Sequence, residues 1–344
     1  MQATDTAPIR PGEELNIPAL QAFLTGKIDG AAQGIELEQF PGGHSNLTYL
    51  LRAGGREYVL RRGPLGPVAP KAHDMAREFH ILQAVHPHFA AAPNVYVLCE
   101  DTTITGGVFF LMERRRGVIV RTGIPEEFAV IPDHARSLSE AFVDCLASLH
   151  EVDIERHGLV QLGKPEGFLD RQVKGWAGRW SRAQTTPLAA MDRIIGWLES
   201  AMPTPLAATL VHNDFKLDNM MFAPRDPTRV AAVLDWEMTT VGDPLVDVGL
   251  TLCYWQLGSV SAQPTSMGLF SRADFLARYA RRTGRDLSRI DWYEVLGMFK
   301  LAVILQQIFY RYHNGQTQDP RFQHFDQRVA ALVADAVTLL EKTA

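Results

Sequence analysis

The chain has 344 residues, of which 46% are hydrophobic and 21% charged, so it can build one or two sizeable cores and is not a disordered chain. Its formal net charge of −5 argues against a general nucleic-acid-binding protein. The three cysteines lack the C-x-x-C spacing of zinc sites, which argues against a zinc or disulfide framework and favours a reducing cytoplasm.

The N-terminal residues 1–11 are polar and lack the apolar core of a secretory signal. No apolar run approaches the length of a membrane span, so we expect no membrane association. Residues 1–13 are expected to form a flexible tail.

Residues 14–113 have the pattern of a small β-rich lobe. Helical spacing comes first, and alternating apolar residues then predict a three-stranded antiparallel meander, a helix ended by a proline, and two more strands. Gly54-Gly55 is typical of a two-residue hairpin turn. The expected elements are a helix over 15–28, strands over 35–39, 47–51 and 58–60, a helix over 75–85, and strands over 95–98 and 108–112.

Residues 114–344 are expected to form a mainly helical lobe after a connector at 114–117. Amphipathic spacing predicts its helices, and one apolar run predicts a buried strand. The helical patterns lie at 138–149, 168–180, 194–198, 292–313 and 325–340, and the strand at 230–234.

Two short motifs in this second half have the residues that phosphoryl transfer requires. His212 begins an H-x-D-x4-N pattern that contains Asp214 and Asn219, and Asp235 follows the apolar run 230–234. A charge at the end of a buried strand is costly unless it is paired or binds a ligand. One carboxylate can orient an attacking hydroxyl and accept its proton, while a carboxylate and an amide hold Mg²⁺ against nucleotide phosphates.

Chance is the alternative explanation for either motif alone. Asp214 could cap a helix, and Asn219 could lie in an ordinary polar turn. The two motifs in this order and close together favour the catalytic explanation.

The arrangement of lobes and motifs resembles the protein-kinase-like fold, and its details resemble the aminoglycoside phosphotransferase and choline kinase superfamily. Trp236 follows Asp235 where protein kinases have D-F-G, and residues 242–249 are similar to the G-D-P-x-x-D-x-G segment of the superfamily. Residues 42–48, 58–62 and 171–176 are similar to a subgroup associated with acyl-CoA dehydrogenases. The resemblance implies an α+β bilobal fold, with a small antiparallel-sheet N-terminal lobe and a larger, mainly helical C-terminal lobe.

The resemblance also implies a role for individual residues. Asp214 would be the catalytic aspartate, and Asn219 and Asp235 the metal ligands. His212 and Asp243 would support the catalytic loop. The residues expected to contact the nucleotide come from a phosphate loop, the third strand, the following helix and a strand end, and they are Gly43, Ser45, Asn46, Arg61, Glu78 and Glu113.

Several of these assignments have alternatives. Arg61 stands where the V-A-I-K pattern has lysine; arginine also binds phosphate, but the neighbouring Arg62 leaves a solvated strand-end arginine possible. Glu78 could instead be an exposed helix carboxylate that pairs with Arg77 or Lys71. The loop at 42–48 lacks G-x-G-x-x-G and could be an ordinary turn, and Glu113 could be an ordinary strand end.

The expected activity is transfer of the γ-phosphoryl group of Mg·ATP to a hydroxyl of a small molecule. The alternative is a weak or inactive kinase-like nucleotide-binding module, against which the three intact motif residues argue. Residues 250–330 hold ten Lys or Arg against six Asp or Glu, so we expect an anionic, hydroxyacyl-CoA-like acceptor rather than an aminoglycoside. A solvated basic helix face would explain the same charges.

Overall fold

The computed structural model describes residues 5–41, 46–64, 74–256 and 267–343. The chain forms two compact units, of which the first comprises residues 1–117 with 231–238, and the second residues 118–230 with 239–344. The domain boundaries expected from sequence, 1–13, 14–113 and 114–344, stay a prediction. In the described part of the chain, no helix is long and apolar enough to cross a membrane.

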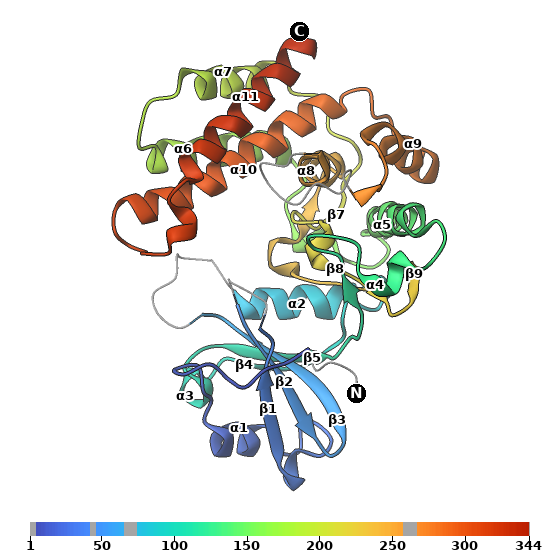
Figure 1. The fold of residues 1–344 in the computed structure, drawn as a ribbon, viewed down its shortest axis with the longest axis vertical. Helices are drawn as coiled ribbons and strands as arrows, with labels where there is room; N and C mark the ends of the chain where they lie inside the picture. The colour runs from blue at the N-terminus through green and yellow to red at the C-terminus, as the bar shows by residue number, and fades with distance from the viewer. Residues whose placement is uncertain (1–4, 42–45, 65–73, 257–266, 344) are drawn as a thin grey trace. The chain divides into compact units, whose positions relative to one another are not determined.

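A five-stranded antiparallel sheet forms the framework of the first unit (Figure 1). Its strands follow the order β1-β2-β3-β5-β4, and the predicted meander is confirmed because β2 pairs with both β1 and β3. Gly54 and Gly55 join β2 to β3 with φ of 55° and 77°, the left-handed conformations of a type I′ turn. The strands are β1 Ile35–Gln39, β2 Leu47–Ala53, β3 Arg56–Arg62, β4 Val95–Cys99 and β5 Phe109–Glu113.

Helices cover both faces of this sheet. Phe109 and Phe110 are neighbours in β5, so their side chains point to opposite faces. Phe109 contacts the ring of Phe23 in α1 (Ile17–Leu24), with ring centroids 5.8 Å apart. Phe110 contacts the ring of Phe79 in α2 (Met75–Val85), with ring centroids 6.1 Å apart. One face of the sheet therefore belongs to α1 and the other to α2.

The predicted helix over 75–85 is confirmed by α2, whereas α1 is shorter than the pattern over 15–28. Asn16 caps α1 by accepting a hydrogen bond from the Ala19 N–H. Gly26 then takes a φ of 79°, a conformation that a right-handed helix cannot continue through. A single turn, α3 (Thr102–Thr105), lies between β4 and β5.

Residues 5–13, which we expected to belong to a flexible tail, lie along the edge strand β1. Ala7 forms an antiparallel bridge with Gln39, and the Arg10 N–H donates to Oε1 of Gln39 at 2.9 Å. The hydroxyl of Tyr49 donates to the carbonyl of Glu13 at 2.7 Å. These contacts cover an edge that would otherwise present unpaired backbone groups.

The second unit is mainly helical, as predicted, and α10 packs against α6, α8 and α11 (Figure 1). Its helices are α4 Glu126–Ala129, α5 His134–His150, α6 Phe168–Ala183, α7 Ala189–Ser200, α8 Leu245–Gln256, α9 Arg272–Thr283, α10 Ile290–His313 and α11 Phe325–Thr343. Where α8 crosses α10, a Cβ on Gly249 would overlap the backbone carbonyl of Tyr293. Only glycine permits so close a crossing at this position.

Short strands lie among these helices. β7 pairs with β10, while β6, β8 and β9 form a second small sheet. The strand predicted over 230–234 is confirmed as the end of β9, although β9 begins earlier, at Asp226. The strands are β6 Val118–Ile119, β7 Thr209–Val211, β8 Met220–Ala223, β9 Asp226–Val233 and β10 Thr240–Gly242.

A buried carboxylate near the start of α8 connects this core to the loop after β7. Asp247 accepts hydrogen bonds from the backbone N–H groups of His212 and Asn213, each at 2.6 Å. Nε2 of His150, at the end of α5, lies 3.3 Å from Oδ2 of Asp247, and its Nδ1 lies 2.7 Å from the hydroxyl of Tyr279. Burial lowers the pKa of His150, although Asp247 opposes that shift.

This network predicts that part of the stability depends on pH. Because the folded-state pKa of His150 is lowered, the unfolded chain binds more protons below the ordinary value of 6.5, so the contribution of His150 is lost as the pH falls. Urea unfolding at pH 7.5 and 5.5 should show a larger loss in the wild type than in His150→Gln, by at most about 1.4 kcal/mol per pH unit. Equal losses would mean that His150 does not titrate differently in the two states.

Candidate active site

The loop after β7 carries the H-x-D-x4-N motif, and its backbone is held from several sides. Besides the bonds from Asp247, Nζ of Lys300 in α10 donates to the carbonyl of Asn213 at 3.0 Å. Asn213 has a φ of 67°, a left-handed conformation that asparagine tolerates better than most residues. The loop therefore presents Asp214 from a fixed backbone.

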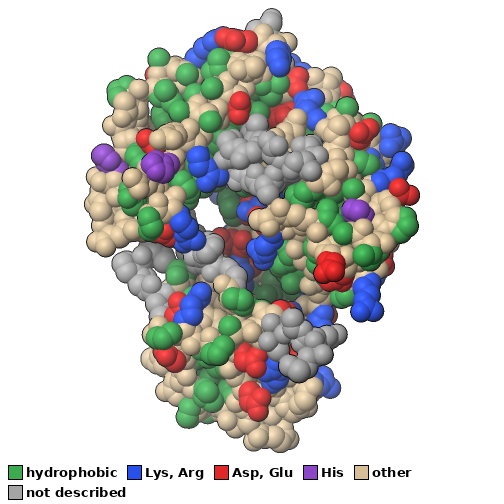
Figure 2. Space-filling view, viewed as in Figure 1, with side chains coloured by type: hydrophobic (Ala, Val, Ile, Leu, Met, Phe, Trp, Pro, Cys, Tyr) green, Lys and Arg blue, Asp and Glu red, His purple; other side chains and the backbone are tan. Residues whose placement is uncertain are grey.

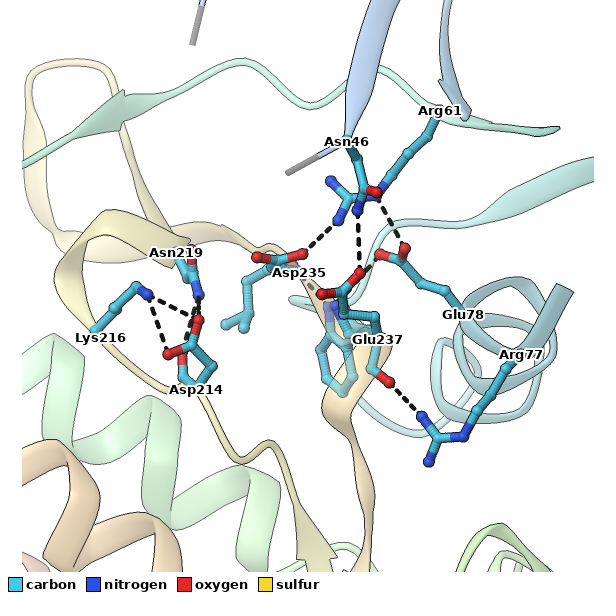
Figure 3. Close-up of polar contacts among 11 residues, drawn as sticks. Asn46, Arg61, Arg77, Glu78, Asp214, Lys216, Asn219, Asp235 and Glu237 are labelled. Atoms are coloured by element: carbon cyan, nitrogen blue, oxygen red, sulfur yellow. Dashed lines mark hydrogen bonds and ion pairs between the residues drawn. The ribbon is translucent and has the colours of Figure 1, made fainter. Parts of the chain in front are cut away.

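The carboxylate of Asp214 accepts hydrogen bonds from three side chains (Figure 3 shows two of them). Nζ of Lys216 lies 3.0 Å from Oδ1 and 2.8 Å from Oδ2. The amide of Asn219 donates to Oδ2 at 2.9 Å, and the hydroxyl of Tyr254 in α8 donates to Oδ1 at 2.9 Å. These contacts fix the orientation of the carboxylate.

Asn219 ends the short 3-10 turn Leu217–Asn219 and is buried. Its Nδ2 donates to both the backbone carbonyl and the carboxylate of Asp214, each at 2.9 Å. Because the amide nitrogen is engaged in this way, the amide oxygen is the atom that remains to ligate a metal ion. The metal role of Asn219 stays a prediction.

His212 and Asp243 were both expected to support the loop. His212 is fully buried, and its Nδ1 accepts a hydrogen bond from the Asp214 N–H at 3.3 Å. Asp243 instead accepts from the N–H groups of Leu206 and Leu245 and from the hydroxyl of Tyr293. Asp247, four residues further on, makes direct hydrogen bonds to the loop, and the supporting role of Asp243 stays a prediction.

In the first unit, the register of β3 decides which arginine reaches the candidate nucleotide site. Arg61 stands opposite Phe110 and so projects to the α2 face, whereas Arg62 stands opposite Phe109 on the α1 face. Arg62 is buried there and donates to the carbonyl of Thr105. Of the two arginines between which the sequence could not decide, Arg61 is therefore the one on the α2 face.

Arg61 is bound by two carboxylates. Its Nε donates to Glu78 of α2 at 2.9 Å, and its second amino group donates to Oδ1 of Asp235 (Figure 3). Burial tends to lower the pKa of Arg61, but Glu78 and Asp235 outweigh it and raise that pKa above its ordinary value. The pairing of Arg61 with Glu78 is therefore present, while their contact with a nucleotide stays a prediction.

Glu78 is not the exposed helix carboxylate that was its alternative. It is 1% exposed, and Oε1 accepts a hydrogen bond from the Trp236 N–H at 3.3 Å. Burial raises the pKa of Glu78 to about 7, against the opposing effect of Arg61. Without Arg61, burial would raise the pKa of Glu78 further.

Asp235 follows β9 and has a φ of 68°. Left-handed backbone at a residue other than glycine is uncommon and concentrates at functional sites. Its side chain is 32% exposed, so it can still accept a ligand beside Arg61.

The expected phosphate loop is only partly described, because Gly43 and Ser45 lie outside the described residues. Asn46 is buried, and its Nδ2 donates to Oε2 of Glu237 at 3.0 Å (Figure 3). Its Oδ1 is buried and has no hydrogen-bond partner among residues 5–41, 46–64, 74–256 and 267–343. A buried acceptor without a donor is costly, so this atom is suited to a ligand.

Glu113 ends β5, and its backbone N–H donates to the carbonyl of Asn94 at 2.8 Å. Its side chain pairs with Arg115 at 2.8 Å. Since the N–H is engaged within the sheet, the expected contact of Glu113 with adenine stays a prediction for its carbonyl group only.

The residues of the two motifs fit a magnesium ion in their chemistry. Asp235 and Asn219 offer only oxygen ligands, and Mg²⁺ takes few protein oxygens because phosphates and water complete its shell. Among the described residues, no group of three His, Cys, Asp or Glu side chains is assembled to hold a metal alone.

Sequence reasoning missed three residues around Asp214. Lys216 lies two positions after Asp214, so the motif itself could have drawn attention to it. Tyr254 and Lys300 come from α8 and α10, and no local pattern marks them as neighbours of the loop.

Some basic residues of 250–330 pair with acids elsewhere in the chain, and others pair with acids of the same segment. Arg278 pairs with Asp144 and Glu140 in α5, and Arg272 pairs with Asp291 and Glu294. On the face of the helical unit drawn in Figure 2, Lys and Arg lie interspersed with Asp and Glu. The charge count of this segment therefore does not by itself define a basic acceptor pocket.

Comparison with known proteins gives the family. The model of the phosphotransferase enzyme family matches residues 36–293. Acyl-CoA dehydrogenase family member 10 of Mus musculus is 33% identical over 329 residues, which are 93% of this chain and 30% of that protein. Acyl-CoA dehydrogenase family member 11 of Rattus norvegicus is 34% identical over 328 residues, which are 90% of this chain and 41% of that protein. The chain thus spans less than half the length of these relatives.

Solved structures of phosphotransferases are similar to this chain. A protein of Ralstonia eutropha JMP134 assigned to the aminoglycoside phosphotransferases has a TM-score of 0.82 at 28% identity, covering 96% of this chain and 99% of that one. The ternary complex of aminoglycoside phosphotransferase APH(4)-Ia with AMP-PNP and hygromycin B has a TM-score of 0.60 at 19% identity, covering 92% and 98%, a likeness of fold.

These comparisons confirm the expected α+β, protein-kinase-like fold and the resemblance to the subgroup associated with acyl-CoA dehydrogenases. Because the family model matches well over half of its length, the chain belongs to the phosphotransferase enzyme family.

Proposed function

We propose that this chain is a small-molecule kinase that transfers the γ-phosphoryl group of Mg·ATP to a hydroxyl group. The observation that carries the proposal is the carboxylate of Asp214, held by Lys216, Asn219 and Tyr254 on a loop that Asp247 and Lys300 fix. Positioning and electrostatics supply most of the catalysis in phosphoryl transfer, so a rigid aspartate at this position supports an enzyme rather than a passive module.

Each residue has a separate task in the proposed mechanism. Asp214 orients the acceptor hydroxyl and accepts its proton as the oxygen attacks phosphorus. Lys216 lies within 2.8 Å of Asp214, where its charge can stabilise negative charge that develops on the transferred group. Asn219 and Asp235 would hold magnesium, which when bound neutralises phosphate charge.

The acceptor is proposed to be an anionic hydroxylated compound of the hydroxyacyl-CoA type. The support comes from the curated relatives, whose names state acyl-CoA dehydrogenase, and from Lys216 and Lys300 beside the catalytic loop. Two lysines beside Asp214 disfavour a polycationic aminoglycoside. A reducing cytoplasm stays our expectation for its location.

Removing the catalytic carboxylate should abolish turnover while nucleotide still binds. For Asp214→Asn we expect kcat to fall by about 10³-fold or more, since a general base typically contributes 10²–10⁴-fold and this one also orients the hydroxyl. Radiolabelled transfer from ATP measures turnover, and thermal shift with Mg·AMP-PNP measures binding. Asp226→Asn, at a surface carboxylate of the second unit, is the control. Turnover near the wild-type rate would remove Asp214 from the mechanism, and nucleotide binding by the wild type without transfer would favour the inactive module.

The metal role of Asp235 predicts a selective loss of nucleotide binding. Asp235→Asn keeps the shape but removes a hard anionic ligand, so the stabilisation by Mg·AMP-PNP should disappear while the melting temperature without nucleotide changes little. Asp29→Asn, at an exposed carboxylate that pairs with Arg56 at 3.1 Å, is the matched control in the same unit. An unchanged nucleotide-induced stabilisation would contradict the assignment.

The acceptor class can be tested by steady-state kinetics. Hydroxyacyl-CoA thioesters and free hydroxy acids should be phosphorylated with a kcat/KM about a hundredfold above that of kanamycin, because juxtaposed like charges cost several kcal/mol. ATP consumption corrected for hydrolysis without acceptor is the measurement. Efficient phosphorylation of kanamycin would overturn the anionic class and leave the kinase assignment intact.

A further inference from the structure

Helix α6 presents an arginine whose charge the mechanism above does not use. Arg179 is exposed, and its guanidinium stacks over the ring of Trp176, with Cζ 4.2 Å from the ring centroid. Among the described residues no acid or hydrogen-bond acceptor pairs with this guanidinium. A stacked guanidinium keeps its N–H donors directed outward along its plane, where they match a carboxylate or phosphate.

The ring of Trp176 connects this arginine to the catalytic loop. Nζ of Lys300 lies 5.7 Å from the same ring centroid and donates to the carbonyl of Asn213, the residue before Asp214. The stacked arginine is thus connected to the backbone just before Asp214 through an indole ring and a lysine side chain.

Helices α6 and α10 run side by side along this stretch. Lys300 meets Trp176, and two turns later Gln306 donates to the carbonyl of Ala183 at 2.9 Å. Contacts that lie further along α10 therefore also lie further along α6. Arg179 lies between the two contact points.

Positive charge predominates at this place. Arg179 and Lys216 both act on Lys300, and together with burial, which is the largest effect, they lower the pKa of Lys300 to about 8 in spite of Asp214 and Asp247. Burial lowers the pKa of Arg179 as well, and Arg182 adds to that effect. Three of these cations, Arg179, Lys216 and Lys300, face two acids, Asp214 and Asp247, so an anion that binds here is stabilised.

We propose that Arg179 and Trp176, with the buried charge of Lys300 behind them, form a subsite that binds the anionic group of the acceptor, a carboxylate or a phosphate. The inference rests on the proposed function, because it concerns the acceptor of that reaction. It assigns a binding role to a helix outside the motifs, and it gives the anionic acceptor a defined partner.

Anion binding can be measured without turnover. Inorganic phosphate and acetate are titrated separately, at constant ionic strength, into the full chain saturated with Mg·AMP-PNP, and thermal stabilisation is followed. The wild type should show saturable stabilisation, and Arg179→Gln should raise the half-saturating concentration about tenfold, the effect of losing one charge-assisted hydrogen bond. A response to phosphate alone indicates a phosphate-bearing acceptor, and a response to acetate indicates a carboxylate.

Lys174→Gln is the matched control, because Lys174 is an exposed cation of the same helix that pairs with Asp170 at 2.8 Å. It should stay within about twofold of the wild type, the size of effect left by an exposed ion pair. Equal effects of the two variants, or no saturable anion effect in the wild type, would overturn the subsite. Failure to bind Mg·AMP-PNP would instead count against the proposed function, and the titration without nucleotide would still decide on Arg179.

Discussion

The buried carboxylate of Asp247 is the constraint on which the candidate site depends. A carboxylate that is 0% exposed is destabilising unless hydrogen bonds replace its lost hydration. Asp247 meets this demand with the N–H groups of His212 and Asn213 and with the ring of His150. The two bonds from the loop are short, and they fix its backbone, in which Asn213 is left-handed and Asp214 follows it. The geometry of the candidate site thus depends on Asp247, for which we propose no contact with a substrate.

The surroundings of Asp214 follow from that backbone path. Lys216 and Asn219 reach the carboxylate from within the motif, and Tyr254 reaches it from α8. Burial raises the pKa of Tyr254 well above its usual range, and Asp214 adds to the effect, so the phenol remains a donor. Three donors on two oxygens hold the carboxylate in one orientation. The proposed acceptor hydroxyl would share or replace one of these donors, and the single bond from Tyr254 to Oδ1 is the one most similar to it in chemistry.

Sequence predicted what short-range patterns determine. The strands around Gly54-Gly55, the helix over 75–85 and the linked pair Asp214 and Asn219 depend on residues close in the chain. The choice between Arg61 and Arg62 needed the register of β3 against β5, which a single strand does not contain.

Tertiary structure decided what the local patterns could not. Tyr254 and Lys300 are brought to Asp214 by helix packing, and the partners of Arg278 lie in α5, far outside the segment whose charges were counted. A net charge summed over a window therefore says little about the field at a site, because ion pairs form across the fold.

The two units differ in which sign of charge predominates at their candidate sites. Around Arg61 the first unit gathers three carboxylates, those of Glu78, Asp235 and Glu237, each of which affects the pKa of that arginine. Such an excess of negative charge is relieved by a cation, and magnesium with its bound phosphates is the cation that the proposed reaction provides. In the second unit, Asp214, Asp247, Arg179 and Lys216 all act on Lys300, so three cations there face two carboxylates, a difference that the proposed anionic acceptor would relieve. Because a binding site is stabilised most by the charge it lacks, this difference supports the proposals of a metal-bound nucleotide for the first unit and of an anionic alcohol for the second.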